Sequence, residues 1–214
     1  MYKTFFKRLI DFSVALIGLL IISPIFLLVT VLLWLDFKGT PFFRQQRPGK
    51  NEEIFSIIKF KTMNNKTDEY GKLLPDGQRI TKLGKVIRKT SIDEIPQLLN
   101  VLKGDMSLVG PRPLLPSYLP YYKKNERIRH SVRPGITGLA QVSGRNFLTW
   151  EEKFAYDTEY VENLTLLLDI KILIKTVKKA LIGQDVAFDA DEIVERLDVY
   201  RQNQMERKSV LKKV

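Results

Sequence analysis

An uncharged apolar segment near the N-terminus is the strongest pattern in the chain. It runs from Phe12 to Leu35, 24 residues of which 19 are apolar and none is charged. A helix of this length can cross a bilayer with some tilt. Ser23-Pro24 divides it into two arms of about 18 Å each, a little over half the thickness of the hydrocarbon core. We therefore expect either a tilted spanning helix or a re-entrant hairpin broken at Ser23-Pro24.

Backbone chemistry and charge both favour the hairpin. Pro24 lacks a backbone donor and clashes with the Leu20 carbonyl, and the Ser23 hydroxyl can satisfy the carbonyl that is freed. Basic residues next to a membrane segment tend to stay in the cytoplasm. A hairpin that enters and leaves the membrane on the cytoplasmic face therefore suits a segment with basic residues on both sides. These residues are Lys3, Lys7 and Arg8 before it and Lys38, Arg44, Arg47 and Lys50 after it. Proline also occurs in spanning helices, so the spanning alternative stays open.

The chain beyond the apolar segment is polar and is predicted to form short strands, a loop and helices. Residues 42–63 have strand-like apolar positions around a turn at Arg47-Pro48-Gly49, and the polar residues 64–78 are expected to form a loop. The positions Ile80, Leu83 and Ile87 then have helical spacing.

The next helix is predicted to begin at Ser91 and to carry two adjacent acids. Ser91 and Glu94 have the spacing of a capping box, apolar positions follow at helical spacing, and Gly104 is suited to end the helix. Asp93 and Glu94 would then lie in the first turn, where free N–H groups and the helix dipole create positive potential. Acids are common at helix starts, so this pattern alone allows a purely structural role.

Two segments rich in proline, glycine and arginine follow, SLVGPRPLLP and VRPGITGLAQVSGR. They are too irregular for a predicted helix or regular strand. Arg112 stands between Pro111 and Pro113, which fix its backbone, and Arg133 and Arg145 flank a loop containing glycines that let backbone N–H groups approach a ligand. One arginine guanidinium can donate two parallel hydrogen bonds to phosphate oxygens, so these loops suit a diphosphate. The alternative is ordinary turns with surface arginines.

The C-terminal part contains a basic amphipathic pattern and a charged tail. Lysines flank one apolar face, as in a helix lying in an anionic membrane interface; a surface helix with this face on the core is the equal alternative. The face consists of Leu167, Ile170, Ile174, Val177 and Leu181. The tail from residue 184 begins acidic and ends basic, and we expect a frayed terminal helix without assignable chemistry.

Composition narrows the chemistry of this chain. Its 214 residues have a net charge of +11, no cysteine and a single histidine, His130. This excludes disulfides, thiolate nucleophiles and Cys- or His-rich metal sites. We expect a mostly helical α+β protein with a membrane hairpin over residues 1–40, one compact catalytic domain over 41–183 with interfacial amphipathic helices, and a helical tail over 184–214.

The motifs together resemble those of the bacterial sugar transferases, also called monotopic phosphoglycosyl transferases. The resemblance rests on KTSIDEIPQLLNVLKGDMSLVGPRP, RPGITGLAQVSGR, QQRPG, KFKTM and the Ser-Pro-interrupted segment, in order over about residues 1–180. The short length resembles that of the minimal members of the family, and among these the chain looks most like the small bacillosamine-1-phosphate transferases of bacterial protein glycosylation.

The resemblance implies a reaction and a site. A UDP-sugar would donate sugar-1-phosphate to a polyprenol phosphate such as undecaprenyl phosphate, releasing UMP. Asp93 would be the nucleophile that forms a covalent phosphosugar intermediate, and Glu94 with Asp93 would hold Mg²⁺. Matching substrate-binding positions are Lys59, Arg88, Pro111, Arg112, Pro113, Arg145 and Asp157.

The resemblance also implies a location and partners. The enzyme would sit in the bacterial inner (cytoplasmic) membrane with its catalytic domain facing the cytoplasm, in contact with membrane lipids and downstream glycosyltransferases. Leu139 and Ser143 stand where relatives often have Trp and Asn, which affects the expected sugar or nucleotide contacts.

Three other functions compete with the transferase. A membrane-tethered binding protein would use Asp93 and Glu94 only as caps, and a glycosyltransferase that moves the sugar alone would release UDP. Nucleic-acid binding would fit the charge of +11, but the sequence has no recognised reader motif, so no nucleic-acid partner is expected.

Overall fold

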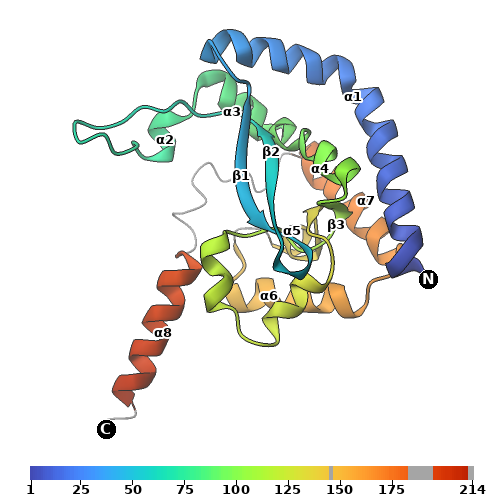
Figure 1. The fold of residues 1–214 in the computed structure, drawn as a ribbon, viewed down its shortest axis with the longest axis vertical. Coiled ribbons are helices and arrows are strands. Elements are labelled where there is room, and N and C mark those ends of the chain that lie inside the picture. The colour runs from blue at the N-terminus through green and yellow to red at the C-terminus, as the bar shows by residue number, and fades with distance from the viewer. Residues whose placement is uncertain (145–146, 183–194, 212–214) are drawn as a thin grey trace.

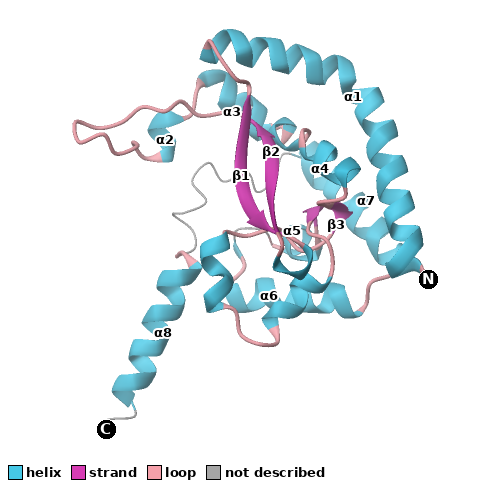
Figure 2. Ribbon diagram, in the orientation of Figure 1, coloured by secondary structure: helices cyan, strands magenta, loops and turns pink. Residues whose placement is uncertain are grey.

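Helices make up most of the computed structural model, which describes residues 1–144, 147–182 and 195–211 (Figures 1 and 2). Strands form two small ladders, so the predicted mostly helical α+β class is confirmed for the described residues. The helices are α1 Lys7–Phe37, α2 Asp76–Arg79, α3 Lys82–Lys89, α4 Gln97–Lys103, α5 Leu139–Ser143, α6 Trp150–Glu162, α7 Leu166–Ile182 and α8 Leu197–Leu211. The strands are β1 Phe42–Pro48, β2 Ile54–Phe60, β3 Ser107–Val109 and β4 Gly135–Thr137.

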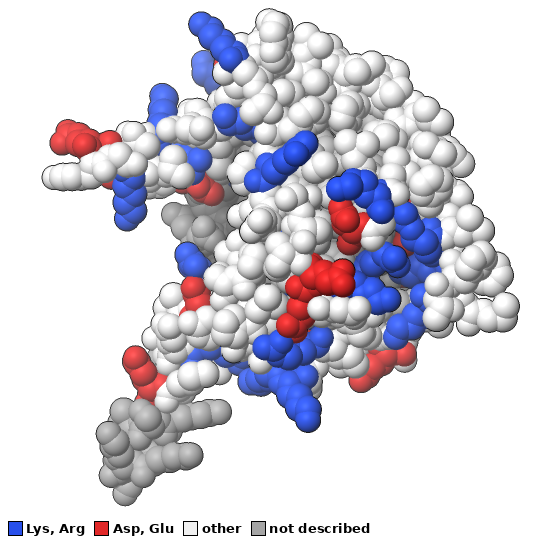
Figure 3. Space-filling model, viewed as in Figure 1, with Lys and Arg blue, Asp and Glu red and all other residues white. Residues whose placement is uncertain are grey.

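The apolar segment forms one continuous helix, α1, which extends a short π-helical start and bends between two arms (Figure 1). Pro24 lies inside α1, and the Ser23 hydroxyl donates to the Leu20 carbonyl at 2.8 Å, the contact expected from the sequence. By length and composition, Tyr2–Phe37 is sufficient to cross a membrane. Figure 3 shows the surface along most of α1 without charged side chains. Its apolar side chains are accordingly exposed, with Ile21 73% exposed and Leu20 66%.

Both ends of α1 nevertheless pack on the same domain. At the start, Lys7 Nζ lies 2.7 Å from Asp169 Oδ2, and Asp11 accepts a hydrogen bond from the Ser107 hydroxyl at 2.7 Å. Towards the end, Leu33 is fully buried in a cluster with Phe60 of β2. The bend therefore brings two distant parts of the helix onto one body.

The predicted strands at 42–63 form the antiparallel hairpin β1–β2, which pairs Phe42 with Phe60 and Pro48 with Ile54. The helix expected at 80–90 is α3, and Ile87 on its inner face is 2% exposed. The expected loop at 64–78 contains the single turn of α2 near its end. These elements are local in sequence, which explains why their patterns predicted them.

The proline- and glycine-rich segments are more regular than expected. Ser107–Val109 and Gly135–Thr137 pair in parallel as β3 and β4, and α5 follows directly. A side chain at Gly135 would meet the Gly110 backbone nitrogen at 2.1 Å, and one at Gly138 would meet the Gly110 oxygen at 2.2 Å. These glycines therefore permit close packing of two backbones.

Helix α7 presents the predicted apolar face to the outside. Leu167 is 61% exposed, Ile174 63% and Val177 58%, while Ile172 on another face is buried in the core. The core-facing alternative is thus wrong for these residues; the side chain of Leu181 lies outside the described part. Lysines flank this exposed face, as an interfacial helix requires.

Candidate active site

The two adjacent acids lie in a short 3₁₀ turn, η3 Ile92–Glu94, ahead of α4. The predicted capping box is wrong, because Ser91 has a left-handed backbone (φ 56°, ψ 17°) and its side chain caps nothing. The helix begins at Gln97 after Pro96 and ends at Gly104 as expected. A left-handed non-glycine residue costs about 1 kcal/mol or more. The acids therefore lie in a turn with a strained backbone. They are not in the first turn of α4, so its dipole does not stabilise them as the sequence predicted.

Glu94 is held by two cations from distant parts of the chain. Lys59 Nζ on β2 lies 2.7 Å from Glu94 Oε1, and Arg112 Nη2 lies 3.1 Å from the same oxygen. Lys59 Nζ also lies 4.0 Å from Asp93 Oδ2. The structure thus brings together Lys59, Asp93, Glu94 and Arg112, as the sequence interpretation expected.

These surroundings separate the protonation of the two acids. Burial raises the pKa of Asp93 to about 6, with Lys59 opposing the shift and the negative Glu94 adding to it. Burial would also raise the pKa of Glu94, but the charges of Arg112 and Lys59 outweigh it and lower that pKa to about 2. Near pH 7, Glu94 is a fixed anion, and Asp93 is an ionised carboxylate that is poorly solvated.

Arg88 and the Pro-Arg-Pro motif lie around this pair. Arg88 Nε donates to the Thr62 hydroxyl at 3.0 Å, and its charge lowers the pKa of Asp93. Pro111 and Pro113 are buried while Arg112 between them is exposed, which fits a rigid backbone presenting a guanidinium. A small cavity is lined by both Pro48-Gly49 and Pro111-Arg112-Pro113, so the QQRPG and Pro-Arg-Pro motifs meet.

Arg47 of the QQRPG motif is a candidate binding residue, which the sequence interpretation treated as a basic flank and as part of a turn. Its Nη2 donates to Gln45 Oε1. Burial and then the charge of Arg112 lower the pKa of Arg47 to about 10. Two nearby guanidiniums are favourable when an anion lies between them. The motif around Arg47 was the signal that could have identified it.

Asp157 lies in the interior and does not join the acids directly. It is 5% exposed and accepts from Arg129 Nε at 3.0 Å, and Arg129 is itself 4% exposed. Arg129 Nη2 in turn donates to the Arg112 carbonyl at 2.6 Å. Asp157 therefore acts on the site through Arg129 and the backbone of Arg112. No sequence pattern pointed to Arg129, because Asp157 lies 28 positions away and the Arg112 carbonyl carries no sequence signature.

Of the two loop arginines that flank the glycine-containing segment, the structure describes Arg133. Arg133 Nε donates to the Gly104 carbonyl at 2.7 Å, so Arg133 closes the end of α4. Arg145 lies outside the described residues. The lone histidine, His130, is buried with Nδ1 3.2 Å from the Gly49 oxygen, and burial lowers its pKa to about 4. His130 is therefore a neutral structural residue of the loop at Gly49.

A divalent cation would find two protein carboxylates here. Within the described residues, no group of three or more His, Cys, Asp and Glu side chains could hold a metal ion. Mg²⁺ commonly takes one or two carboxylates and completes its shell with phosphate oxygens and water. Asp93 and Glu94 fit that requirement when a phosphate ligand is present. The site as a whole suits a polyanionic ligand, since Lys59, Arg88 and Arg112 surround it.

Comparison with known proteins gives consistent matches. The profile described as bacterial sugar transferase matches residues 2–183. The sugar transferase EpsL of Bacillus subtilis (strain 168) is 51% identical over 180 residues, 84% of this chain and 89% of EpsL. The UDP-glucose:undecaprenyl-phosphate glucose-1-phosphate transferase of Caulobacter vibrioides is 37% identical over 185 residues, 82% of this chain and 69% of that protein. The UDP-N-acetylgalactosamine-undecaprenyl-phosphate N-acetylgalactosaminephosphotransferase of Aeromonas hydrophila is 40% identical over 187 residues, 84% of this chain and 44% of that protein.

Proposed function

The chain belongs to the bacterial sugar transferase family, and we propose that it transfers a sugar-1-phosphate from a UDP-sugar to a polyprenol phosphate, releasing UMP. The names of the Caulobacter and Aeromonas relatives, which specify undecaprenyl phosphate and a sugar phosphate, support this reaction class. The observation that carries the proposal for this chain is the arrangement of Asp93 beside Glu94, with Lys59 within 4.0 Å of both.

The chemistry would proceed in two displacements at phosphorus. A carboxylate oxygen of Asp93 attacks the sugar-bearing phosphorus of the donor, the phosphoanhydride bond breaks, and UMP leaves with the bond electrons. An oxygen of the polyprenol phosphate then attacks the same phosphorus and releases the Asp93 carboxylate. Covalent catalysis of this kind divides one difficult transfer into two easier ones.

The cations around Asp93 would make this attack feasible. A carboxylate and a diphosphate repel each other, so the approach requires positive charge at the reacting phosphate. Arg112 and Arg88 would neutralise the donor, while Lys59 would hold Glu94 and keep Asp93 ionised. Mg²⁺ held by Asp93, Glu94 and phosphate oxygens would further neutralise the diphosphate when bound.

We propose a monotopic attachment to the inner membrane with the catalytic domain in the cytoplasm. Both ends of α1 contact the same domain, which supports a re-entrant hairpin that enters and leaves on one face. The exposed apolar face of α7 with its flanking lysines supports a second contact with anionic lipid headgroups. This arrangement would keep Asp93 near the phosphate of a membrane-embedded polyprenol.

A UMP-release assay tests the reaction directly. Purified enzyme is incubated with Mg²⁺, undecaprenyl phosphate and a panel of UDP-sugars that includes glucose, N-acetylgalactosamine and diacetylated bacillosamine donors. The last donor tests the hypothesis that the enzyme is a bacillosamine-1-phosphate transferase of protein glycosylation. That the lipid-linked product is passed to downstream glycosyltransferases is a further hypothesis. We expect UMP with at least one donor, and Asp93→Asn should lose about three orders of magnitude of rate.

Other outcomes of the same assay would identify the competing functions. Release of UDP would indicate a glycosyltransferase that moves the sugar alone. Absence of nucleotide release with every donor, with donor binding intact, would indicate a binding protein. A fully active Asp93→Asn variant would refute the role of Asp93 as nucleophile.

A further inference from the structure

Helix α8 follows the region matched by the family profile, and it docks on the catalytic domain. Leu197 at its start is fully buried in a cluster that includes Tyr122, Trp150 and Phe154. The indole Nε1 of Trp150 donates to the Glu195 carbonyl at 2.8 Å. The terminal helix expected from the sequence is present, and buried contacts fix its start to the domain.

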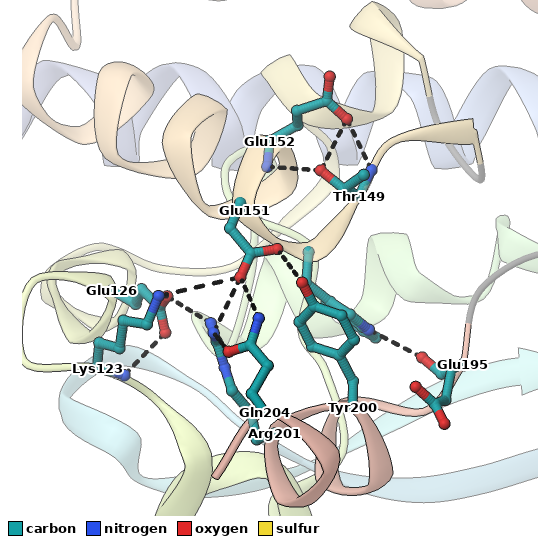
Figure 4. Close-up of polar contacts among 10 residues, drawn as sticks. Lys123, Glu126, Thr149, Glu151, Glu152, Glu195, Tyr200, Arg201 and Gln204 are labelled. Atoms are coloured by element: carbon teal, nitrogen blue, oxygen red, sulfur yellow. Dashed lines mark hydrogen bonds and ion pairs between the residues drawn. The ribbon is translucent and has the colours of Figure 1, made fainter. Parts of the chain in front are cut away.

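Arg201 is the centre of the polar part of this contact (Figure 4). Its side chain is 4% exposed, with Nη2 2.6 Å from Glu126 Oε1 and Nη1 3.0 Å from Glu151 Oε1. Tyr200 also donates to Glu151, at 2.8 Å. Glu126 begins the short helical segment η5 Glu126–Ser131, and Glu151 lies in the first turn of α6. One arginine of α8 therefore joins two segments of the catalytic domain.

The segment held by Arg201 also carries Arg129. Arg129 lies three positions after Glu126 and donates to the Arg112 carbonyl at 2.6 Å. The guanidinium carbons of Arg129 and Arg201 lie 5.7 Å and 6.0 Å from the centre of the Phe154 ring, so this ring lies beside both. These contacts therefore connect α8 with the backbone of Arg112. Helix α8 and helix α1 lie at opposite ends of the view in Figure 1.

We propose that α8 is a positioning element for the donor site, in which Arg201 fixes Glu126 and η5 so that Arg129 holds Arg112 in its binding orientation. This inference rests on the proposed function, because it assigns Arg112 to the donor diphosphate. Arg201 touches no substrate in this scheme and acts only through Glu126 and Arg129. The polyprenol acceptor, which approaches from the membrane at α1, is not expected to depend on it.

Steady-state kinetics of the full-length enzyme test this scheme. Arg201→Gln removes the α8 charge that lies between Glu126 and Glu151 and leaves Lys123, whose Nζ lies 3.8 Å and 3.9 Å from these two carboxylates. Arg201→Lys keeps the charge but lacks the forked geometry. Arg196→Gln is the matched control, because it removes the same charge from an exposed position just before α8. We expect the donor KM of Arg201→Gln to rise about fivefold, the effect of losing roughly one hydrogen bond. Arg201→Lys should be intermediate, and Arg196→Gln should match the wild type.

The pattern of constants separates positioning from a merely structural role. A partly unfolded variant would have a lower kcat with both KM values unchanged, and that result would overturn the proposal, as would an Arg201→Gln variant with wild-type constants. If Arg201→Gln does not fold, the same measurements on Arg201→Lys decide.

Hydrogen–deuterium exchange gives a readout that does not need activity. Arg201→Gln should exchange faster than Arg196→Gln across residues 110–113 and 126–131, with β1–β2 unchanged in both. Equal exchange in the two variants would overturn the proposal. An inactive wild type would refute the proposed function, whereas equal exchange would refute only the inference about α8.

Discussion

Lys59 Nζ lies 2.7 Å from Glu94 Oε1, which gives the glutamate a strong cationic partner and leaves the neighbouring Asp93 with a weaker one at 4.0 Å. The two acids consequently differ in pKa, about 2 for Glu94 and about 6 for Asp93. A nucleophilic carboxylate must be ionised, so the proposed role of Asp93 predicts that its pKa sets the acidic limit of activity.

We expect kcat/KM for the donor to fall as the pH drops through about 6. Lys59→Gln removes a charge that lowers the pKa of Asp93, so the acidic limb should move to higher pH and the rate at pH 7 should fall about tenfold. Lys66→Gln removes the same charge from the exposed loop and should leave the profile unchanged. A limb that stays in place in Lys59→Gln would contradict the assignment of the titration to Asp93.

The two acids should have opposite effects on stability at pH 7.5. The folded-state pKa of Asp93 lies above its ordinary value of 3.8, so its stabilising contribution is present below about pH 4 and is lost as the pH rises through 6. Asp93→Asn should therefore raise the free energy of unfolding, on the order of 1 kcal/mol. Glu94→Gln should lower the free energy of unfolding, because the pKa of Glu94 is depressed in the folded state and its replacement leaves Lys59 and Arg112 without this anionic partner. Thermal unfolding in detergent measures both, and equal signs would be inconsistent with the site described.

Local patterns predicted the elements whose contacts are also local. The bond from Ser23 to the Leu20 carbonyl follows from helix geometry at a proline, and the hairpin β1–β2 and helix α3 follow from nearby residues. The start of α4 could not be predicted in this way. Glu94 contacts Lys59, 35 positions away, and Arg112, 18 positions away, and these ion pairs replace the capping box.

The candidate site was only partly predictable for the same reason. The resemblance indicated Asp93, Glu94, Lys59 and Arg112, and the structure places them together. Arg129 gave no signal, because its role arises from Asp157, 28 positions away, and from a backbone carbonyl that carries no sequence signature.

The buried pair Arg129–Asp157 should be important for stability. Asp157→Asn leaves the Arg129 charge buried without its partner, and such changes typically cost about 3 kcal/mol or more. We expect a lower denaturation midpoint and, because Arg129 holds the Arg112 carbonyl, a weaker donor affinity. Glu159→Gln on the exposed side of the same helix is the matched control and should change neither. An Asp157→Asn variant as stable as this control would show that the pair contributes little.

The exposed face of α7 should contribute to membrane binding. Ile174 is 63% exposed between lysines, so Ile174→Glu places a negative charge where the proposal puts lipid. We expect weaker binding to vesicles containing anionic lipid. Val199→Glu introduces the same charge at a 39% exposed position on α8 and should leave binding unchanged. Equal vesicle binding by the two variants would show that α7 does not contact the membrane.

The hairpin predicts that both flanks of α1 lie on one side of the membrane. Lys7 contacts Asp169 and Leu33 packs beside Phe60, so a spanning helix would have to break one of these contacts to place its ends on opposite faces. The absence of cysteine from the chain permits single-cysteine labelling at Lys3 and at Thr40, with Lys124→Cys marking the side of the catalytic domain. A membrane-impermeant thiol reagent should label all three in inverted vesicles and none in intact spheroplasts. Labelling of the Lys3 and Thr40 positions from opposite sides would instead establish the spanning helix, and Lys124 would then show which end of α1 leaves the domain.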